Sequence, residues 1–415
     1  MNQQKIRIGL YGFGCVGRGL YDVLSETKGI RAEIVRICVK DQHKKRDLPG
    51  HYFTFDPEEI VHREDVDIVV ELIDHADAAF DIVSTALRNR KAVVSANKKM
   101  IAEHFEELLS LQETYGVPLL YEGATCASIP VIRNLEEYYD NDLLRSLQGI
   151  VNGSTNFILS RMHSESSTFD AALKLAQQLG FAESNPALDV EGHDAAYKLS
   201  ILLAHAFGLV VKPEEIFRLG IQRLGELESR YAREKGYKIK LVAYARQLGN
   251  TVSAFVLPRF VAKDEIFYRT DDAYNAVQIE GAFAEKQSFT GKGAGAYPTG
   301  SAVLSDISAL TYDYRYAYKK LRQQEGIRLD NDFVLEVFVR FGAKSGVDEK
   351  DFIHISEKYD SSTGSYLKGK INFNQLIHSA WINDSGVSVV VTAESEIETQ
   401  LSVLLHEGST IMMQD

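Results

Sequence analysis

A chain of 415 residues is longer than an ordinary single domain, so its length predicts about two or three domains, each with its own core. Hydrophobic residues make up 45% and charged residues 25%, a balance that excludes a largely disordered chain. The net charge of −12 argues against general binding to nucleic acid, so any anionic cofactor must be held by local groups.

The N-terminal sequence and the cysteines predict a cytoplasmic protein. The segment MNQQKIRIGLYGFG enters a strand directly, without the apolar core and cleavage site of a signal peptide. No apolar run reaches the roughly 18 residues that a membrane span needs. Three widely spaced cysteines, Cys15, Cys38 and Cys126, are typical of reduced thiols rather than of a disulfide framework. We therefore expect neither a membrane nor a nucleic acid as partner.

The first third of the chain alternates short β-branched runs with helical stretches, which is the pattern of a parallel sheet covered by helices. In the predicted helix Ile101–Tyr115, Ile101, Phe105 and Leu108 share one face. The predicted strands are Lys5–Leu10, Ile34–Val39, Asp67–Leu72, Lys91–Ser95 and Pro118–Tyr121. We predict an α/β fold whose Rossmann-type nucleotide-binding domain begins with residues 1–130.

A glycine motif directly follows the first predicted strand and opens the first helix. Gly12 allows the tight turn, Gly14 lets the backbone approach a pyrophosphate, and Gly17 lets the helix pack closely on the strand. The alternative is a glycine-rich turn in another kind of α/β protein. The candidate cofactor-binding residues here are Gly12, Phe13, Gly14, Cys15, Val16 and Gly17.

The residues after the second predicted strand bear on the choice of cofactor. An acidic residue there holds the ribose 2′-hydroxyl of NAD, whereas a basic residue suits the 2′-phosphate of NADP. Lys40 and Asp41 follow the strand, and Lys44, Lys45 and Arg46 come next. Lys40 and the basic cluster favour NADP, Asp41 keeps NAD open, and a solvated loop explains the cluster equally well.

From about residue 131 to 290 the pattern changes to longer helices with a few strands, among them Leu147–Val151 and Val252–Val261. This pattern predicts an α+β domain for substrate. A glycine-rich stretch, Gly291–Gly295, then precedes the predicted helix Ser301–Leu310. The tail continues as strand-like segments, and we predict a small C-terminal α+β domain over residues 313–415.

The segment Gly180–Gly208 concentrates ionisable groups beside apolar residues. A helix starting near residue 193 places Asp194 and Lys198 on one face, and its apolar continuation predicts that it is buried. Reduction of a carbonyl by hydride needs a proton donor, and a lysine in a partly desolvated pocket suits that task. Asp189 and Glu183 on the preceding loop suit a substrate ammonium group. On spacing alone, a structural cluster of ion pairs explains these residues equally well.

Lys98 is the second candidate lysine of the chain. It follows the fourth predicted strand, at the carboxyl edge of the sheet where ligands bind in this fold class, and can serve cofactor or substrate. The histidines His75, His193 and His205 show no spacing typical of a metal site, and we interpret them as ordinary histidines.

Five segments together resemble the homoserine dehydrogenases, from the N-terminus to about residue 310. Each alone is modest evidence, but their order and spacing are specific to that family. They are GFGCVG (12–17), SANKK (95–99), GIVNGSTNFIL (149–159), FAESNPALDVEGHDAAYKL (181–199) and GKGAGAYPTGSAVLSDI (291–307).

The resemblance implies NAD(P)-dependent interconversion of L-aspartate 4-semialdehyde and L-homoserine, a step of threonine, methionine and isoleucine biosynthesis. It implies that Lys198 is the catalytic lysine, that Asp189 orients the substrate and that Glu183 contacts its amino group. It further places Asp194 in the substrate pocket and Lys98 at the cofactor–substrate junction.

The resemblance also bears on domains and assembly. The segment around Gly293–Gly295 resembles the loop that returns to the nucleotide domain, which is then completed by residues 291–312 and includes Gly295 in the cofactor site. Members of the family are typically homodimers built through the sheet of the middle domain.

One segment departs from the family pattern. Relatives carry a glycine-rich turn before the proline, where this chain reads EGATCASIP (122–130). In the family this turn holds a sodium ion, which implies Glu122 and the carbonyls of Thr125, Ala127 and Ile129 as ligands here. Cys126 and Ser128 restrict the backbone where glycine would not, so the site is in doubt.

The C-terminal segment corresponds to the place where homoserine dehydrogenases often carry a regulatory ACT domain. It has suitable strands, such as Phe333–Phe341 and Val387–Thr392, but no clear effector loop. The nearest match is Arg340–Val347, so we interpret the segment as a degenerate ACT-like domain and infer no threonine inhibition.

Two alternatives remain open from the sequence. Aspartate-semialdehyde dehydrogenase shares the cofactor but needs a nucleophilic cysteine, for which Cys126 is the candidate, although a buried small hydrophobic residue is the more frequent role. A non-catalytic nicotinamide-binding regulator would need a damaged acid/base site, and Lys198, Asp189 and Glu183 are all present.

Overall fold

The computed structural model describes residues 5–141, 143–323, 326–342, 345–361 and 364–393. Their contacts divide the chain into two compact units. The first unit draws on residues 1–142, 197–213 and 291–325, and the second on 143–196, 214–290 and 326–415. The chain therefore leaves the first unit and returns to it twice. Among the described residues, no helix combines the length and the apolar character that a membrane span requires.

The first unit is built on a six-stranded parallel sheet with the order β3-β2-β1-β4-β5-β6. Its strands are β1 (Ile6–Tyr11), β2 (Ala32–Cys38), β3 (Phe53–Thr54), β4 (Ile68–Glu71), β5 (Ala92–Ser95) and β6 (Leu119–Leu120). Its helices are α1 (Cys15–Glu26), α2 (Pro57–His62), α3 (Ala76–Arg88), α4 (Lys98–Glu103), α5 (Phe105–Tyr115), α6 (Val131–Arg133), α13 (Ala296–Leu310) and α14 (Lys319–Gln323).

This strand order is that of a doubly wound dinucleotide-binding fold. Strand β1 pairs with β2 on one side and with β4 on the other, so the order reverses beside β1. In such sheets ligands bind outside the carboxyl ends of the strands at the point of reversal. The predicted α/β fold with a Rossmann-like domain is therefore confirmed.

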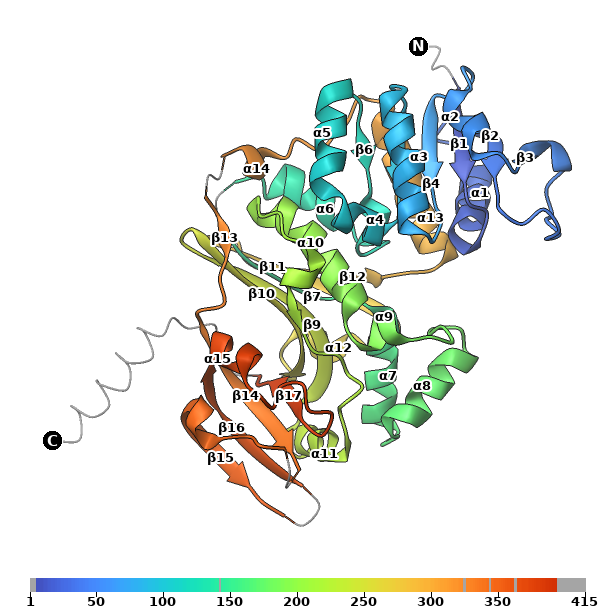
Figure 1. Ribbon diagram of the computed structural model, residues 1–415. Coiled ribbons are helices and arrows are strands. Elements are labelled where there is room, and N and C mark those ends of the chain that lie inside the picture. The colour runs from blue at the N-terminus through green and yellow to red at the C-terminus, as the bar shows by residue number, and fades with distance from the viewer. Residues whose placement is uncertain (1–4, 142, 324–325, 343–344, 362–363, 394–415) are drawn as a thin grey trace. The chain divides into compact units, whose positions relative to one another are not determined.

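Helices cover both faces of this sheet (Figure 1). On one face, Leu10 and Val70 of the strands join Leu20 of α1 and Val303 of α13 in a single buried cluster. Figure 1 shows α3 and α5 on the opposite face. Because successive residues of a strand point to opposite faces, strands covered on both sides must be apolar throughout, as the fully buried β4 is.

Helices α1 and α13 pack against each other through glycines. A Cβ at Gly19 would lie 2.1 Å from the carbonyl oxygen of Ala296, and a Cβ at Gly300 would lie 2.7 Å from the carbonyl carbon of Gly19. The two backbones therefore approach more closely than any side chain allows. This contact attaches the returning segment 291–325 to the helix that follows the glycine motif.

The second unit contains a mixed sheet whose continuous order is β12-β11-β7-β9-β10-β17-β14-β16-β15, with β8 and β13 also pairing with β10. Its strands are β7 (Leu144–Ile150), β8 (Phe217–Arg218), β9 (Lys238–Leu248), β10 (Thr251–Val261), β11 (Tyr274–Gly281), β12 (Glu285–Lys292), β13 (Arg328–Leu329), β14 (Val334–Phe341), β15 (Phe352–Tyr359), β16 (Ser365–Asn372) and β17 (Ser388–Val391). Its helices are α7 (Gly153–Ser164), α8 (Phe169–Gln178), α9 (Ala187–Val190), α11 (Glu226–Lys235), α12 (Ile266–Arg269) and α15 (Phe373–His378); α10 (His193–Phe207) begins in this unit and ends in the first.

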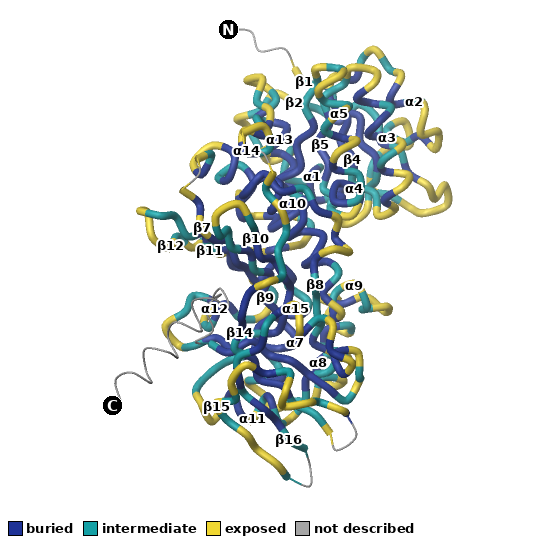
Figure 2. Tube along the Cα trace, turned by 60° about the vertical axis from the view of Figure 1, so that its left-hand side comes forward, coloured by how far each residue is buried: buried dark blue, intermediate teal, exposed yellow. Residues whose placement is uncertain are grey.

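The long strands β9 and β10 form the middle of this sheet. They are joined by a two-residue turn, since Leu248 pairs with Thr251, and Gly249 supplies the left-handed backbone of that turn. Figure 2 shows buried residues following both strands. Their burial places these strands in the core of the second unit.

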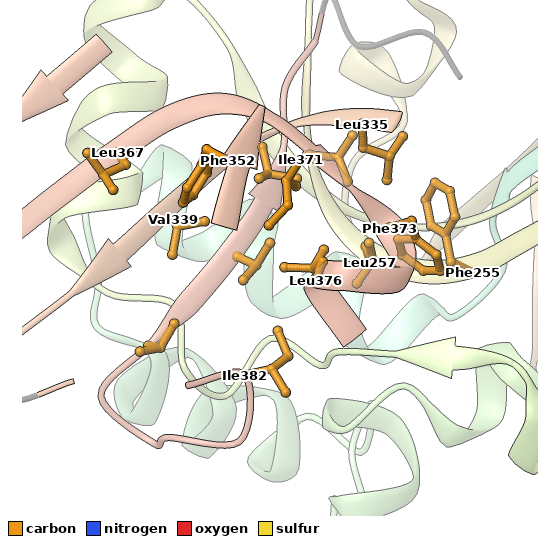
Figure 3. Close-up of a cluster of buried hydrophobic side chains, with 14 of the residues drawn as sticks. Phe255, Leu257, Leu335, Val339, Phe352, Leu367, Ile371, Phe373, Leu376 and Ile382 are labelled. Atoms are coloured by element: carbon orange, nitrogen blue, oxygen red, sulfur yellow. The ribbon is translucent and has the colours of Figure 1, made fainter. Parts of the chain in front are cut away.

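The C-terminal part of the second unit has a split topology. Strand β14 pairs antiparallel with β16 and β17, and β16 also pairs with β15. The third strand of this segment thus lies between the first and the second, as in ferredoxin-like folds. Apolar side chains of β14, β16 and α15, including Leu335, Leu367, Ile371 and Phe373, form a buried cluster with Phe255 of β10 (Figure 3).

The structure confirms the five predicted strands of the first unit to within two residues at each end. The prediction of a single helix Ile101–Tyr115 is wrong, because the helix is interrupted at His104. The ring of His104 stacks on Phe80 at 4.0 Å, and its Nδ1 lies 2.7 Å from the Glu107 carboxylate, which stabilises the break. The predicted helix Ser301–Leu310 begins earlier, at Ala296.

Candidate active site

The glycine motif forms the turn between β1 and α1. Gly12 has φ of +90°, and a Cβ there would lie 2.5 Å from the Leu72 carbonyl oxygen. A Cβ at Gly17 would lie 2.3 Å from the carbonyl oxygen of Gly12. The two positions therefore require glycine for the close packing that the sequence predicted.

The start of α1 suits a pyrophosphate. Gly14 caps the helix without any side chain, and a Cβ added to it would meet no atom within 4 Å. The first turn holds no acidic residue, and Cys15 is exposed, while Val16 is partly buried and Phe13 packs against Phe53. Open N–H groups at a helix N-terminus bind phosphate, so the residues present fit a dinucleotide.

The loop after β2 contains the residues that were predicted to select the cofactor. Lys40 and Asp41 are both exposed. The Oδ1 atom of Asp41 accepts hydrogen bonds from the backbone N–H groups of His43 and Lys44, at 2.8 and 3.2 Å. One carboxylate oxygen of Asp41 thus stabilises its own loop.

Lys98 is the first residue of α4, at the carboxyl end of β5, and it is partly buried. Asn97 caps this helix by accepting a hydrogen bond from the backbone N–H of Met100 at 3.0 Å. Strands β4 and β5 are parallel neighbours, so Lys98 lies at the same sheet edge as the glycine motif. This is the position that the sequence predicted.

Gly295 caps α13 and has φ of +122°. The segment before it lies against the turn 122–130, because the backbone N–H and the hydroxyl of Ser128 both donate to the Lys292 carbonyl, at 3.2 and 3.0 Å. A Cβ at Gly291 would lie 2.6 Å from the Ser128 hydroxyl. Ser128 thus has a defined structural contact in this chain.

The turn 122–130 contains the predicted sodium ligands. The buried carboxylate of Glu122 accepts backbone N–H groups of Ile132 and Arg133, both at 2.9 Å. The carbonyl of Ile129 accepts the N–H of Val131 at 2.8 Å. Two of the predicted sodium ligands, Glu122 and the Ile129 carbonyl, therefore already accept hydrogen bonds from backbone N–H groups.

The backbone of the same turn is strained at Ala127. This residue has a left-handed φ of +43°, whereas Cys126 and Ser128, where the sequence predicted a restriction, do not have a positive φ, and Cys126 is fully buried. Thr125 is also buried, and its hydroxyl donates weakly to the Glu122 carbonyl at 3.4 Å. The sodium site remains a prediction.

Glu122 belongs to a buried charged group of the first unit. Its backbone N–H donates to Asp306 of α13 at 2.9 Å, and Asp306 pairs with Arg133 at 2.8 Å. Burial, together with the nearby Asp306, raises the pKa of Glu122 to about 8. Burial also raises the pKa of Asp306, to about 6.

Three polar residues come together in the second unit at the end of β7. The side-chain amide of Asn152 donates to Oδ1 of Asp189 at 2.7 Å and to Oδ2 of Asp194 at 2.8 Å. The Asn152 Oδ1 atom accepts the backbone N–H of Thr155 at 2.8 Å and so caps α7. Because this N–H must face an oxygen, the orientation of the amide is fixed, and its donors point at the carboxylates.

Helix α10 is buried from Asp194 to Phe207, as its apolar sequence predicted. Asp194 is 4% exposed and Lys198 is 6% exposed. The two residues are four apart on one helix and share a face, so they lie one turn from each other. A buried lysine one helical turn from a buried acid is an arrangement that can serve proton transfer.

Glu183 differs from the other predicted substrate residues. It is exposed, on the loop between α8 and α9, and its backbone carbonyl accepts from Gln177 at 3.0 Å. The structure thus brings Asp189 and Asp194 together. Among the described residues, the Glu183 carboxylate makes no contact with either of them, so its predicted role stays a prediction.

Sequence reasoning missed two features of these units. The role of Asn152 was not predicted, although the string NGST after a strand is a capping signal for α7. His205, interpreted as an ordinary histidine, is fully buried between the Glu136 carboxylate at 2.6 Å and the Tyr121 hydroxyl at 2.8 Å. It anchors the end of α10 inside the first unit. His75 caps α3, and His193 lies 3.2 Å from Glu191.

Comparison with known proteins follows the same segments. A family model described as the NAD binding domain of homoserine dehydrogenase matches residues 12–122, and one described as homoserine dehydrogenase matches residues 130–308. The homoserine dehydrogenase of Neisseria gonorrhoeae is 38% identical over 312 residues, which cover 73% of this chain and 72% of that one. This chain belongs to the homoserine dehydrogenase family.

Other relatives extend the match toward the C-terminus. The homoserine dehydrogenase of Mycobacterium leprae is 36% identical over 417 residues, covering 97% of this chain and 93% of that one. The crystal structure of a homoserine dehydrogenase from Thiobacillus denitrificans has a TM-score of 0.84 at 31% identity, covering 94% and 98% of the two chains. A hyperthermophilic archaeal homoserine dehydrogenase mutant in complex with NADPH has a TM-score of 0.65 at 28% identity, covering 76% and 100%.

These matches make the chain an oxidoreductase with an NAD-binding domain. They lend no support to an aspartate-semialdehyde dehydrogenase or to a non-catalytic regulator. Cys126, the nucleophile that the first alternative needs, is a fully buried residue.

Proposed function

We propose that the chain catalyses the NADP-dependent interconversion of L-aspartate 4-semialdehyde and L-homoserine, with Lys198 as general acid and base. The observation that carries this proposal is the burial of Asp194 and Lys198 one turn apart on α10. A lysine held in this way by the fold can exchange a proton with a substrate oxygen while water is excluded.

The carboxylates are proposed to bind the amino-acid part of the substrate. Asp189 and Asp194 are held side by side by the amide of Asn152, so they present a negative site of fixed geometry. A substrate ammonium group favours such a site because charged hydrogen bonds are the strongest available. Glu183 is proposed as a third carboxylate, which its exposed loop would bring to the substrate amino group.

Proton transfer is proposed to run through Lys198. In the reductive direction the carbonyl carbon gains a hydride, which NADPH supplies when bound, and the carbonyl oxygen gains a proton. The ammonium group of Lys198 provides that proton and becomes an amine. In the oxidative direction the amine takes the proton back from the hydroxyl group. Lys98, at the carboxyl edge of the parallel sheet, is proposed to orient the substrate at the cofactor junction.

NADP is proposed as the preferred cofactor. Lys40 is exposed at the end of β2, where a basic group suits the 2′-phosphate. Asp41 uses one carboxylate oxygen within its own loop, which supports the same preference. The remaining proposed cofactor contacts are the glycine motif, residues 12–17, and Gly295 at the start of α13.

We propose three functional domains: a nucleotide-binding domain of residues 1–130 completed by 291–312, a substrate and dimerisation domain of 131–290, and an ACT-like domain of 313–415. The split order of β14 to β17 supports the last assignment, because the third strand lies between the first and second as in ferredoxin-like folds; the described residues between β14 and β15 form only a short 3-10 turn, Glu349–Asp351. These domain boundaries are proposed from function and differ from the two compact units, because residues 197–213 belong to the first unit.

A homodimer is proposed to form through the sheet of the second unit. Strand β12 lies at one edge of that sheet among the described residues, and edges of this kind readily pair with another chain. Sedimentation velocity across a concentration series tests this proposal.

The direct test of the activity is homoserine oxidation by the purified full chain with NADP and NAD in parallel. We expect homoserine-dependent reduction of both cofactors, with the larger kcat/KM for NADP. No homoserine-dependent reduction of either cofactor would contradict the proposed function.

A further inference from the structure

Glu71 is a fully buried carboxyl group that the proposed reaction does not use. It is the last residue of β4, at the carboxyl edge of the parallel sheet. Its Oε1 atom accepts the backbone N–H of Ile73 at 2.7 Å, and its Oε2 atom accepts the hydroxyl of Ser95 at 2.5 Å. Both partners lie at strand ends, so the side chain joins the turn after β4 to the end of β5.

The hydrogen bonds continue from Ser95 and close into a ring. The Ser95 hydroxyl oxygen accepts the backbone N–H of Asn97 at 3.1 Å, and the Asn97 amide donates to the Ile73 carbonyl at 3.0 Å. Glu71, Ser95, Asn97 and Ile73 thus hold one another through four hydrogen bonds. Asn97, the residue before Lys98, in turn caps α4 by accepting the backbone N–H of Met100, two residues after Lys98.

This ring also reaches the glycine motif. The backbone N–H of Leu72 donates to the Tyr11 carbonyl at 2.8 Å, and Leu72 is the residue whose carbonyl oxygen excludes a side chain at Gly12. The turn after β4 therefore contacts the glycine turn on one side and the start of α4 on the other. The contact with the glycine turn is a backbone hydrogen bond of Leu72, which is not a member of the ring, so a break in the ring should release the start of α4 rather than the glycine turn.

Burial of the Glu71 carboxyl group between two turns costs free energy of folding. No salt bridge joins Glu71 to a cation in the described part of the chain, and burial together with the nearby Asp74 raises its pKa to about 7. A buried polar group costs stability unless it is hydrogen-bonded. The ring of four hydrogen bonds therefore restricts each of its four residues to a single geometry. Such restriction is what a site needs to place a lysine that orients the substrate.

We propose that Glu71, acting through Ser95 and Asn97, is a positioning residue that fixes Lys98 at the start of α4. The proposal rests on the role of Lys98 in the proposed function. It predicts that the ring contributes to turnover through Lys98 and little to the affinity for NADP, which the glycine motif and Lys40 provide.

The test compares Ser95→Ala with Ser84→Ala in the full chain. Ser84 is a second buried serine of the first unit, and its hydroxyl donates to the Asp81 carbonyl of α3 at 3.1 Å. We expect S95A to lower kcat by about 10-fold, the factor that corresponds to one lost hydrogen bond of ordinary strength. The Kd for NADPH, measured by fluorescence, should change by less than about 2-fold, and S84A should leave both values within about 2-fold.

A double-mutant cycle with Lys98→Met separates positioning from general structural support. We expect K98M to lower kcat and S95A to cause less than about 2-fold further loss in the K98M background, because the ring acts through Lys98. Full additivity of the two losses, or an unchanged kcat in S95A, overturns the positioning role while leaving the proposed function intact. An unchanged kcat in K98M overturns the proposed role of Lys98 and the positioning role with it.

Where S95A folds poorly, Glu71→Met provides the second variant. Methionine keeps the length of the side chain but offers no carboxyl oxygen to the Ile73 N–H or to the Ser95 hydroxyl, so it breaks the ring at two bonds. It should show the same fall in kcat and the same non-additivity with K98M. A wild-type kcat in E71M overturns the proposal.

Discussion

The side-chain amide of Asn152 donates to the carboxylate of Asp194 at 2.8 Å, and the same amide nitrogen donates to Asp189 at 2.7 Å. Two negative groups are thereby held side by side at the start of the buried helix that carries Lys198. The amide can do this only because its oxygen is engaged by the backbone N–H of Thr155 at 2.8 Å. One residue thus caps a helix and holds the two carboxylates of the proposed substrate site.

Asn152→Asp should damage the substrate site. The replacement removes both donors and adds a third carboxylate beside Asp189 and Asp194, so repulsion should separate the groups. We expect kcat/KM for homoserine to fall by at least about 10-fold, measured from initial rates at saturating NADP. The control is Asn250→Asp, which alters an exposed asparagine in the β9–β10 turn. Wild-type kcat/KM in N152D would refute the assigned role.

Lys40→Ala should raise the KM for NADP and leave the KM for NAD nearly unchanged. Loss of a cation beside the 2′-phosphate weakens binding of NADP, whereas NAD has no phosphate there. We expect KM for NADP to rise by about 10-fold and KM for NAD to change by less than about 2-fold. Lys28→Ala, at an exposed lysine after α1, is the control. Equal effects on both cofactors would mean that Lys40 does not contact the 2′-phosphate.

The pH dependence of stability should report the buried Glu122. Its pKa in the folded chain is about 8, raised from 4.5, so the folded state holds the proton more tightly than the unfolded state. Stability from this group is therefore present at low pH and is lost as the pH rises from about 4.5 to 8.

Glu122→Gln removes this titration. The free energy of unfolding of the wild type, relative to E122Q, should fall by on the order of 1 kcal/mol or more between roughly pH 5 and pH 9. Urea titrations at both pH values measure the difference. Glu64→Gln, at an exposed glutamate, should show no such change. A difference between wild type and E122Q that is independent of pH would show that Glu122 ionises normally.

Cys126→Ser tests the covalent alternative. The cysteine is fully buried and serves as a small apolar residue, so hydride transfer should continue without its thiol. We expect kcat to stay within about 3-fold of the wild type, together with some loss of stability from the buried hydroxyl. Loss of nearly all turnover in a folded C126S protein would favour a thioester mechanism.

Local patterns predicted much of this structure. The glycine turn, the parallel strands and the buried helix α10 follow from spacing and apolar periodicity, which act over a few residues. The break at His104 could not be predicted in this way, because it depends on a ring contact with Phe80, far away in the sequence. An uninterrupted apolar pattern hides such a break.

The same reasoning explains which site residues were missed. Asp189, Asp194 and Lys198 lie in one short segment and attract notice through their charge. Asn152 is neutral and about forty residues earlier, and Glu71 occupies a strand that reads as apolar; both act through partners that only the folded chain brings near.

The central claim is that Lys198 transfers the proton in homoserine oxidation. The most direct measurement is kcat for homoserine and NADP in Lys198→Met, beside Lys235→Met at an exposed lysine of α11 as control. The account predicts that K198M lowers kcat by about 10²–10⁴-fold, the usual contribution of a general acid, with the Kd for NADP nearly unchanged. A K198M enzyme with wild-type kcat would contradict it.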